Sequence, residues 1–409
     1  MKTLTGLKLI APGLARGVKL MLQATALASL LASSLTSTSV AESLNRKITV
    51  VRETQLVLGN AARAHAIVRT PDGGFVVTGS ILIDTSENKL WATRITSSGE
   101  VVWNYGMPTE ADKDFRGTKG TFVGALMLSD NSALLCGSRT ADERGGPTVG
   151  YLVHVDATGK VLDQSSFYPN GDTRFGLSNI HRCFPWGDGF ALVGATTDGR
   201  QSAGWLIKLD GRGLKEWEKV GPDVGSFDAV ETADHDLVTL DRGPRDFTTT
   251  VHRLNFRGEL IATRDIEGLG NALMRSIGAT VNAYCVTSAF PSGKQTMWTL
   301  DRDLHDANPG RPIGKVVIGS IEGRGFVYPD QSLAVFGQGD GGGGSGIAAI
   351  IYMSPNSKPQ AEFKFRGGEG SIWVNDAVTL QSDTEFATIR EWALSQEKRG
   401  VLLNWVSIK

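Results

Sequence analysis

Neither sign of charge predominates in this sequence. Its 409 residues include 42 Lys and Arg against 43 Asp and Glu, a formal net charge of −1, and no long block of one sign occurs. A protein that binds nucleic acid through the phosphates needs positive charge in excess. We therefore expect no nucleic-acid partner. With 41% hydrophobic and 21% charged residues, the composition is that of an ordinary globular protein.

Long hydrophobic runs are missing except near the N-terminus. There LMLQATALASLLASSL follows a segment whose only charges are positive, and small residues lead up to Ala41. This layout is typical of a secretory signal peptide cleaved after Ala41. An uncleaved membrane anchor is disfavoured, because a 16-residue run containing Gln23 is short for a bilayer that needs about 20. We expect residues 1–41 to be a signal peptide, and the mature chain, 42–409, to be periplasmic or secreted without stable membrane insertion.

Cysteine is scarce, and the three positions are Cys136, Cys183 and Cys285. All three lie in apolar runs, where cysteine is usually a small buried hydrophobic residue. We prefer this interpretation to a disulfide or a reactive thiol, although an exported protein can keep a disulfide. Because three is an odd number, at least one of the cysteines would have no disulfide partner within the chain. If a bridge forms, we expect Cys136 to pair with Cys183, because they lie in neighbouring units of the repeat described next.

Helical periodicity is also missing, since no 11-residue window beyond the N-terminal segment shows it convincingly. The chain instead repeats one phrase, in WATRITSSGEVVW, YLVHVDATGKVLD, WLIKLDGRGLKEW and TVHRLNFRGELIA. Each is an apolar run, a glycine turn and a second run. The turn positions are Gly99, Gly159, Gly213 and Gly258, with degenerate copies at Leu304 and Ser357.

A second marker is a short apolar run that follows a turn of the Asp-Gly or Asn-Ser type, as in a hairpin. Successive runs begin 47 to 58 residues apart, at Phe75, Ala133, Phe190, Leu237, Tyr284, Leu333 and Phe386. The gap from run to turn position stays between 20 and 26 residues. Because another apolar run precedes each marker, every unit predicts four antiparallel strands.

Four antiparallel strands repeated about every 45 to 60 residues are typical of a β-propeller blade. The sequence thus predicts an all-β fold, a single seven-bladed β-propeller of four-stranded blades over residues 42–409. The last unit ends at the C-terminus before its fourth strand, while residues 47–59 belong to no unit. We expect this N-terminal strand to complete the last blade and close the ring, leaving no open sheet edge. Trp103 and Trp217, four residues past a turn glycine, are expected to pack between blades.

The phrases LVHVDATGKVLDQ and LIKLDGRGLKEW, preceded by strands of the GGFVVTGS type, resemble the repeats of exported bacterial β-propellers of the quinoprotein-like and delta-60-like kinds. The resemblance spans nearly all of residues 47–409 and implies the fold. Quinoprotein dehydrogenases usually have eight blades, each with a tryptophan docking motif, and dedicated cofactor and metal ligands. Here the tryptophan occurs in two units, and no cofactor residues match. WD and kelch signatures are absent as well.

Motifs of catalysis and metal binding are missing. The six histidines lack metal-ligand spacing, and no G-x-S-x-G, Walker A or C-x-x-C pattern occurs. We therefore expect no metal, no cofactor and no catalytic residue. The glycine-rich GQGDGGGGSGIAA, 337–349, lacks the Lys-Ser/Thr and the following helix of a phosphate loop. We interpret it as a loop between the second and third strands of the sixth blade.

The rim of the central channel is the expected binding region. Long loops between second and third strands emerge there, at 81–90, 139–150, 196–204, 242–249 and 337–347. Polar candidates near the starts of the inner strands are Arg63, His65, His181, Arg182, Asp228, Arg275, Arg324, Asn375 and Asp376. Arginine outnumbers aspartate, which suits an anionic or carbohydrate-like ligand held by bidentate hydrogen bonds. The alternative is that they are solvated rim residues.

Three functions stay open. The first is a monomeric, non-catalytic scaffold that binds a protein partner through the long-loop face, with an immunity-type protein that neutralises an exported toxin as one form. The second is a glycan-directed hydrolase or lyase at the channel mouth, which needs paired carboxylates about 5 to 9.5 Å apart. Asp228 and Asp376 are candidates for that pair by position alone. The third, a quinone-dependent oxidoreductase, has the least support.

Overall fold

A computed structural model describes most of the chain from Arg46 to Lys409, and these residues form one compact unit. The described ranges are 46–56, 62–82, 88–106, 118–141, 146–172, 176–197, 202–225, 228–242, 248–267, 274–279, 283–289, 295–312, 316–317, 324–328, 330, 332–340, 346–354, 359–365, 373–393 and 399–409. The expected signal peptide, 1–41, lies outside them. Within these ranges no helix is long and apolar enough to cross a membrane.

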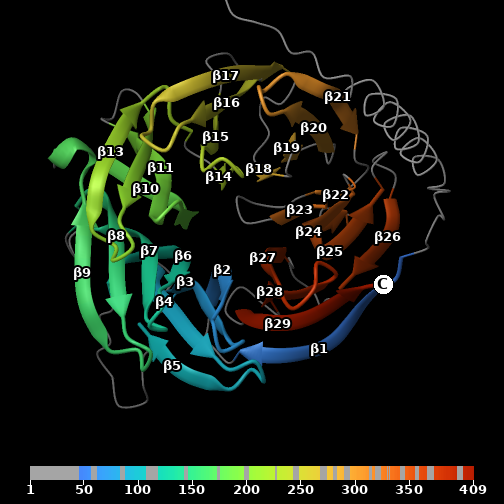
Figure 1. The fold of residues 1–409 in the computed structure, drawn as a ribbon. Helices are drawn as coiled ribbons and strands as arrows, with labels where there is room; N and C mark the ends of the chain where they lie inside the picture. Colours follow the sequence, from blue (N-terminus) through green and yellow to red (C-terminus); the bar gives the residue numbers. More distant parts are fainter. Residues whose placement is uncertain are drawn as a thin grey trace, which may run out of the picture. The chain divides into compact units, whose positions relative to one another are not determined.

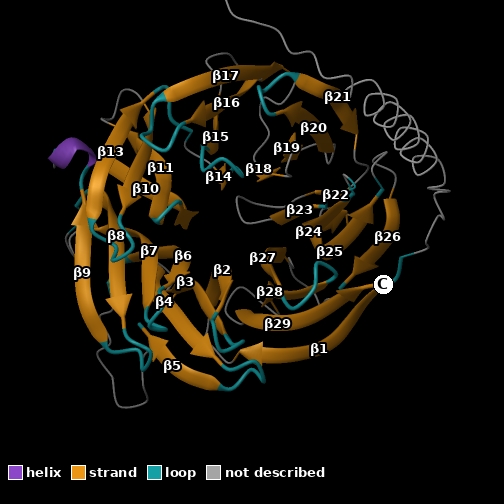
Figure 2. Cartoon of the chain, in the orientation of Figure 1, coloured by secondary structure: helices purple, strands orange, loops and turns teal. Residues whose placement is uncertain are grey.

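The described chain is all-β, as predicted, and a 3₁₀ turn at Pro169–Gly171 is its one helical element (Figure 2). Its strands fall into strand groups that we number in chain order. The first group is β2 (Ala62–Arg69), β3 (Phe75–Leu82), β4 (Asn88–Ile95) and β5 (Val101–Tyr105); the second is β6 (Gly120–Met127), β7 (Ala133–Thr140), β8 (Thr148–Val155) and β9 (Val161–Phe167); the third is β10 (Leu177–Trp186), β11 (Gly189–Thr197), β12 (Ser202–Leu209) and β13 (Lys215–Gly221).

The later groups repeat this order. The fourth is β14 (Asp228–Glu231), β15 (Leu237–Arg242), β16 (Thr248–Leu254) and β17 (Leu260–Glu267); the fifth is β18 (Met274–Ala279), β19 (Ala283–Ala289), β20 (Gln295–Asp301) and β21 (Asp306–Pro312); the sixth is β23 (Arg324–Val327), β24 (Leu333–Asp340), β25 (Gly346–Met353) and β26 (Pro359–Lys364), with β22 (Val316–Val317) also on β24; the seventh is β27 (Trp373–Thr379), β28 (Glu385–Ala393), β29 (Arg399–Ile408) and β1 (Ile48–Leu56). Pairing within each group is antiparallel, and one parallel pair, Leu177 with Thr148, joins the second group to the third.

The second strand of every group begins within one residue of the predicted apolar run. The loops that follow are shorter than predicted, because the strands continue into polar and glycine-rich sequence. In the sixth group β24 extends to Asp340 and β25 resumes at Gly346, so most of the expected loop 337–349 is paired strand. There Gly337 lies opposite Ala349 and Gly339 opposite Ile347. Backbone pairing needs no apolar side chain, and this explains why hydrophobic runs understate strand length.

The innermost strands bring the groups together around a common centre (Figure 1). Each contacts the next in chain order, through β2, β6, β10, β14, β18, β23 and β27, and β27 also contacts β2. At the outside of the seventh group, β1 pairs with β29 from Ile48 opposite Ile408 to Leu56 opposite Val401. A buried guanidinium on β28, that of Arg390, also holds β1 through an ion pair of 2.6 Å with Glu53. The first and last described strands are therefore neighbours in one sheet.

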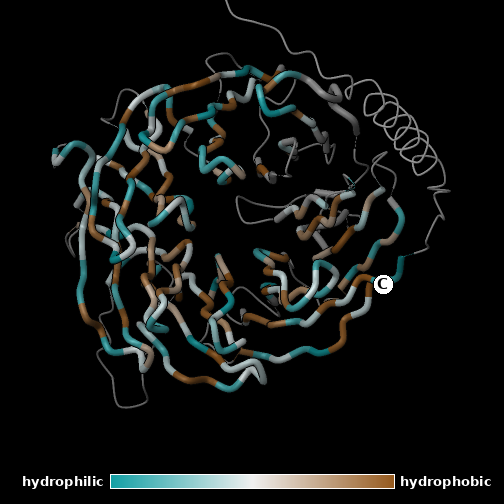
Figure 3. The backbone as a smooth tube through the Cα atoms, in the orientation of Figure 1, coloured by the Kyte–Doolittle hydropathy of each residue, from teal (hydrophilic) through white to brown (hydrophobic). Residues whose placement is uncertain are grey.

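The hydrophobic core lies between neighbouring groups and is divided into separate clusters. Hydrophobic residues accordingly occur on strands throughout the described chain (Figure 3). Alternation along a strand supplies both sides of each sheet. On β28, for example, Phe386 packs against the sixth group, whereas Ala387 and Ile389 pack against the first. The sheet of the seventh group is thus stabilised from both faces.

The repeated turn between third and fourth strands has one construction. In the third group, Asp210 Oδ1 accepts hydrogen bonds from the backbone N–H groups of Arg212 and Leu214, both at 2.9 Å. The Gly213 N–H donates to the Asp210 carbonyl oxygen at 3.0 Å, and Gly213 has φ +84°. That left-handed conformation favours glycine. Leu304, in a degenerate copy, adopts it with φ +65°.

The turn glycines also let tryptophans pack between groups, which confirms the expectation for Trp103 and Trp217. A Cβ added at Gly159, in the second group, would lie 2.6 Å from Cγ of Trp103 in the first. A Cβ added at Gly258, in the fourth group, would lie 2.5 Å from Cη2 of Trp217 in the third. The indole rings occupy the space that a side chain at the turn would need.

We expect Gly159→Ala and Gly258→Ala each to lower the free energy of unfolding by about 2–4 kcal/mol, from left-handed strain plus overpacking on the indole. Urea denaturation measures this loss. The matched control is Gly73→Ala, because Gly73 has φ +83° and nothing within 4 Å of an added Cβ. For this variant the free energy of unfolding should fall only by the contribution of left-handed strain, about 1–2 kcal/mol. Equal losses in all three variants would show that the indole contact contributes nothing.

Candidate functional site

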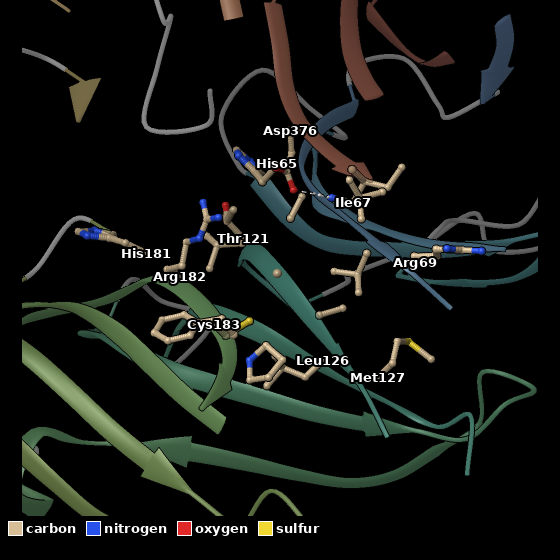
Figure 4. A pocket seen from close by; sticks show the side chains of 18 residues that line it. His65, Ile67, Arg69, Thr121, Leu126, Met127, His181, Arg182, Cys183 and Asp376 are labelled. Atoms are coloured by element: carbon tan, nitrogen blue, oxygen red, sulfur yellow. Dashed lines mark hydrogen bonds between the residues drawn. The ribbon is translucent and has the colours of Figure 1, made fainter. Parts of the chain in front are cut away.

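A cavity of about 440 Å³ lies where the inner strands β2, β6, β10 and β27 face the centre (Figure 4). Its polar lining includes His65, Thr121, His181, Arg182 and Asp376. The rest of the wall is largely apolar. The site therefore combines a few polar groups with a hydrophobic surface, as small-ligand pockets usually do.

Bulges in the inner strands aim side chains at this cavity. The pairing register shifts by one residue in each of β2, β6, β10 and β27, and the extra residues are His65, Val123, His181 and Asn375. A bulge interrupts the alternation of side chains and redirects the one that is added. In β2 the break is visible as two consecutive buried residues, Ala66 and Ile67, directly after His65. His65 and His181 thereby reach the same cavity from separate strand groups.

Arg182 is the fixed charge of the site. Its side chain is 23% exposed, and Nε lies 3.3 Å from Oδ1 of Asp228. Burial lowers the pKa of Arg182, but the carboxylates of Asp228 and Asp376 raise it by more, so the pKa lies above its usual value. The guanidinium stays charged. Among the described residues, its terminal nitrogens Nη1 and Nη2 make no hydrogen bond.

Asp228 and Asp376 are both buried, each only 4% exposed. Asp228 Oδ2 accepts the backbone N–H of Ile277, in the fifth group, at 3.0 Å. Asp376 Oδ2 accepts the backbone N–H of Ile67, in the first group, also at 3.0 Å. Each carboxylate thus joins its inner strand to that of the next group. For these two residues the interpretation as solvated rim groups is wrong.

The other candidates lie apart from this arrangement. Arg63 is exposed and does not line the cavity. Asn375 is fully buried, and its Nδ2 donates to the Ala64 carbonyl oxygen and, at 2.9 Å, to Glu391 Oε1. Arg275 and Arg324 lie in β18 and β23, but their side chains are outside what the structure describes. The structure therefore brings together His65, His181, Arg182 and Asp376, with Asp228 ion-paired to Arg182.

The apolar part of the wall was not anticipated from the sequence. It includes Val123, Leu126, Met127, Phe184 and Val378. In TFVGALML the hydrophobic residues on both faces look alike, so the pattern cannot say which face lines a channel and which packs on a neighbouring sheet. The bulge at Val123 in β6 determines which face lines the cavity.

A disulfide joins Cys136 on β7 to Cys183 on β10. The preferred expectation of buried free thiols is wrong for these two, whereas the pairing indicated by the repeat is correct. Cys183 lines the cavity, and Cys136 is fully buried behind it. Gly124 leaves the room that the bridge needs, because a Cβ there would lie 2.5 Å from Sγ of Cys183. The bond ties the second strand group to the third at the cavity wall.

Within the described ranges, no group of three or more His, Cys, Asp or Glu side chains lies close enough together to hold a metal ion.

Comparison with known proteins gives similarity of fold only. No family model matches the chain, and no curated protein sequence matches it. Among solved structures, a protein of unknown function from Dyadobacter fermentans DSM 18053 is similar at 12% identity with a TM-score of 0.48, covering 88% of this chain and 99% of its own. The Dos1 propeller is similar at 11% identity with a TM-score of 0.48, covering 88% and 95%. The sheets of this chain, gathered around a centre by their inner strands, have the arrangement of a β-propeller.

We expect the variants Cys136→Ser and Cys183→Ser each to lower the free energy of unfolding by about 2–4 kcal/mol, because the bridge closes a loop of 47 residues in the unfolded chain. Urea denaturation with and without dithiothreitol measures this loss. The reductant should destabilise the wild type and leave both variants unchanged. Cys285→Ser is the control and should keep the sensitivity to reductant. A wild type indifferent to complete reduction would contradict the prediction.

Proposed function

We propose that this chain is an exported β-propeller of seven blades, closed by β1, and that it works without catalysis as a scaffold for a protein partner. The ring is supported by the contacts between successive inner strands and by the pairing of β1 with β29. Export is supported by the signal-like layout of residues 1–41 and by the disulfide, which suits an oxidising compartment. The partner binds at the central cavity lined by β2, β6, β10 and β27. Neutralisation of an exported toxin is one form of this function.

The observation that carries the proposal is how the charges of the cavity are used. Asp228 holds the Ile277 N–H and pairs with Arg182, and Asp376 holds the Ile67 N–H. Carboxylates engaged in this way stabilise the junctions between blades and are poorly placed to move protons for a reaction. The cavity is lined by two arginines, two histidines and Asp376, next to a largely apolar wall. Such a surface suits recognition.

Site-specific photo-crosslinking tests this function in the exported fraction of the native host. With a photoreactive amino acid at His65 or His181, we expect one protein to be crosslinked in stoichiometric amount. The control position is Phe256, which is 61% exposed in the turn of the fourth group. N-terminal sequencing should find the chain starting after Ala41. Crosslinking from the control position alone, or from none of the three, would refute the proposal.

One observation favours the second candidate, a glycan-directed hydrolase or lyase, since His65, His181 and Asp376 line one cavity. If Asp376 were a catalytic acid or base, Asp376→Asn would abolish release of reducing ends from a glycan panel and leave sugar binding intact. We expect instead that the wild type releases none. We also expect Asp376→Asn to act on stability, because the Ile67 N–H loses a charged acceptor. If the wild type released reducing ends and Asp376→Asn did not, the glycan-directed enzyme would be the correct interpretation.

A further inference from the structure

We propose that the central cavity binds a single carboxylate group attached to an apolar body, with the guanidinium of Arg182 as its anchor. The inference deepens the proposed function and rests on it, because it names the chemistry that the cavity recognises in its partner. It depends on the orientation of Arg182, on the charges beside it and on the apolar wall.

The guanidinium is held in place from one side. Its Nε lies 3.3 Å from Asp228 Oδ1, and Asp228 is itself fixed by the N–H groups of Ile277 and Ala229 at 3.0 and 2.9 Å. Because Nε is engaged, the terminal nitrogens are the edge available to a ligand. Two parallel N–H groups on one edge match the two oxygens of a carboxylate.

The surroundings of Arg182 add donors and limit the ligand's charge. The imidazoles of His65 and His181 lie on either side of the guanidinium, and Thr121 is beside it (Figure 4). Asp228 and Asp376 contribute two negative charges to the same space, as their effect on the pKa of Arg182 shows. Arg69 also lines the cavity, but its Nη1 donates to the Leu380 carbonyl oxygen at 2.6 Å. Arg182 can match one ligand carboxylate, whereas a second negative charge would be repelled by the two aspartates. The site therefore prefers a monoanion to a dianion.

The apolar part of the wall determines which chemical group the ligand carries besides its carboxylate. Val123, Leu126, Met127, Phe184 and Val378 surround the space beyond the polar groups. A volume of about 440 Å³ holds a small aromatic or branched aliphatic group. Two sources carry this chemistry: a free carboxylic acid, or the C-terminal residue of a partner protein when that residue is apolar.

Isothermal titration calorimetry on the purified mature chain tests the proposal with matched probes. We expect 3-phenylpropionate to bind at least about tenfold more tightly than its neutral amide, because a hydrogen-bonded charge is lost in the amide. Benzylmalonate, which adds a second carboxylate to the same body, should also bind at least about tenfold more weakly. The peptide Gly-Gly-Phe and its C-terminal amide form the second arm. Tighter binding of the peptide acid than of 3-phenylpropionate identifies a partner's C-terminus as the source, and the reverse order identifies a free acid.

Two variants separate recognition from folding. Arg182→Gln should weaken binding of 3-phenylpropionate at least about tenfold. Should the loss of the Asp228 pair unfold that variant, Met127→Trp leaves the pair intact and fills the apolar part of the cavity, so it should abolish binding. Equal affinity for acid and amide, or no binding of either acid by the wild type, overturns the inference. A partner crosslinked at His65 without acid binding refutes this inference alone. Acid binding without any partner refutes the scaffold function alone.

Discussion

Close approach between neighbouring sheets is the constraint on which the rest of this structure depends. Among the described residues, five of the seven strand groups bury both faces against their neighbours, so a side chain added at such a contact has to displace a ring or a backbone. Gly159 and Gly258 meet this constraint in two ways, since they adopt the left-handed conformation of the turn and leave space for an indole ring of the preceding group. Gly124 does the same for the disulfide beside the cavity. Small residues thus set the spacing of the sheets, and the spacing sets the size of the central cavity.

The repeated pattern made the fold predictable from the sequence. A turn and an apolar run stay in step along the chain, and the strands begin within a residue of the predicted positions because hairpin turns have strong sequence requirements. Strand ends were less predictable. The pairing of Gly337 with Ala349 needs only backbone groups, so glycine-rich sequence that looks like a loop forms part of a ladder. A hydrophobic pattern reports only burial, whereas these strand ends are stabilised by backbone hydrogen bonds.

The candidate site was predictable only in part, for a different reason. Nine polar residues shared a position near the starts of inner strands, yet one-residue bulges in β2, β10 and β27 change which side chains face the cavity. The extra residue His65 faces the cavity, whereas the extra residue Asn375 is buried and bonded to the Ala64 carbonyl oxygen. A bulge changes no composition and leaves only a short break in alternation. The disulfide was not the preferred expectation for a related reason: a cysteine in an apolar strand can equally well be buried as a free thiol.

The backbone of the inner strands explains why two buried aspartates, Asp228 and Asp376, lie near the centre. An inner strand is the edge of its sheet, and part of its backbone N–H groups therefore lacks a partner within the sheet. Asp376 accepts such an N–H from Ile67 and Asp228 one from Ile277, while Ser138 Oγ accepts that of Ile180 at 2.7 Å. These acceptors satisfy backbone N–H groups where neighbouring inner strands meet. Their negative charge in turn keeps Arg182 charged, so the same residues that join the inner strands also hold a cation that faces the cavity.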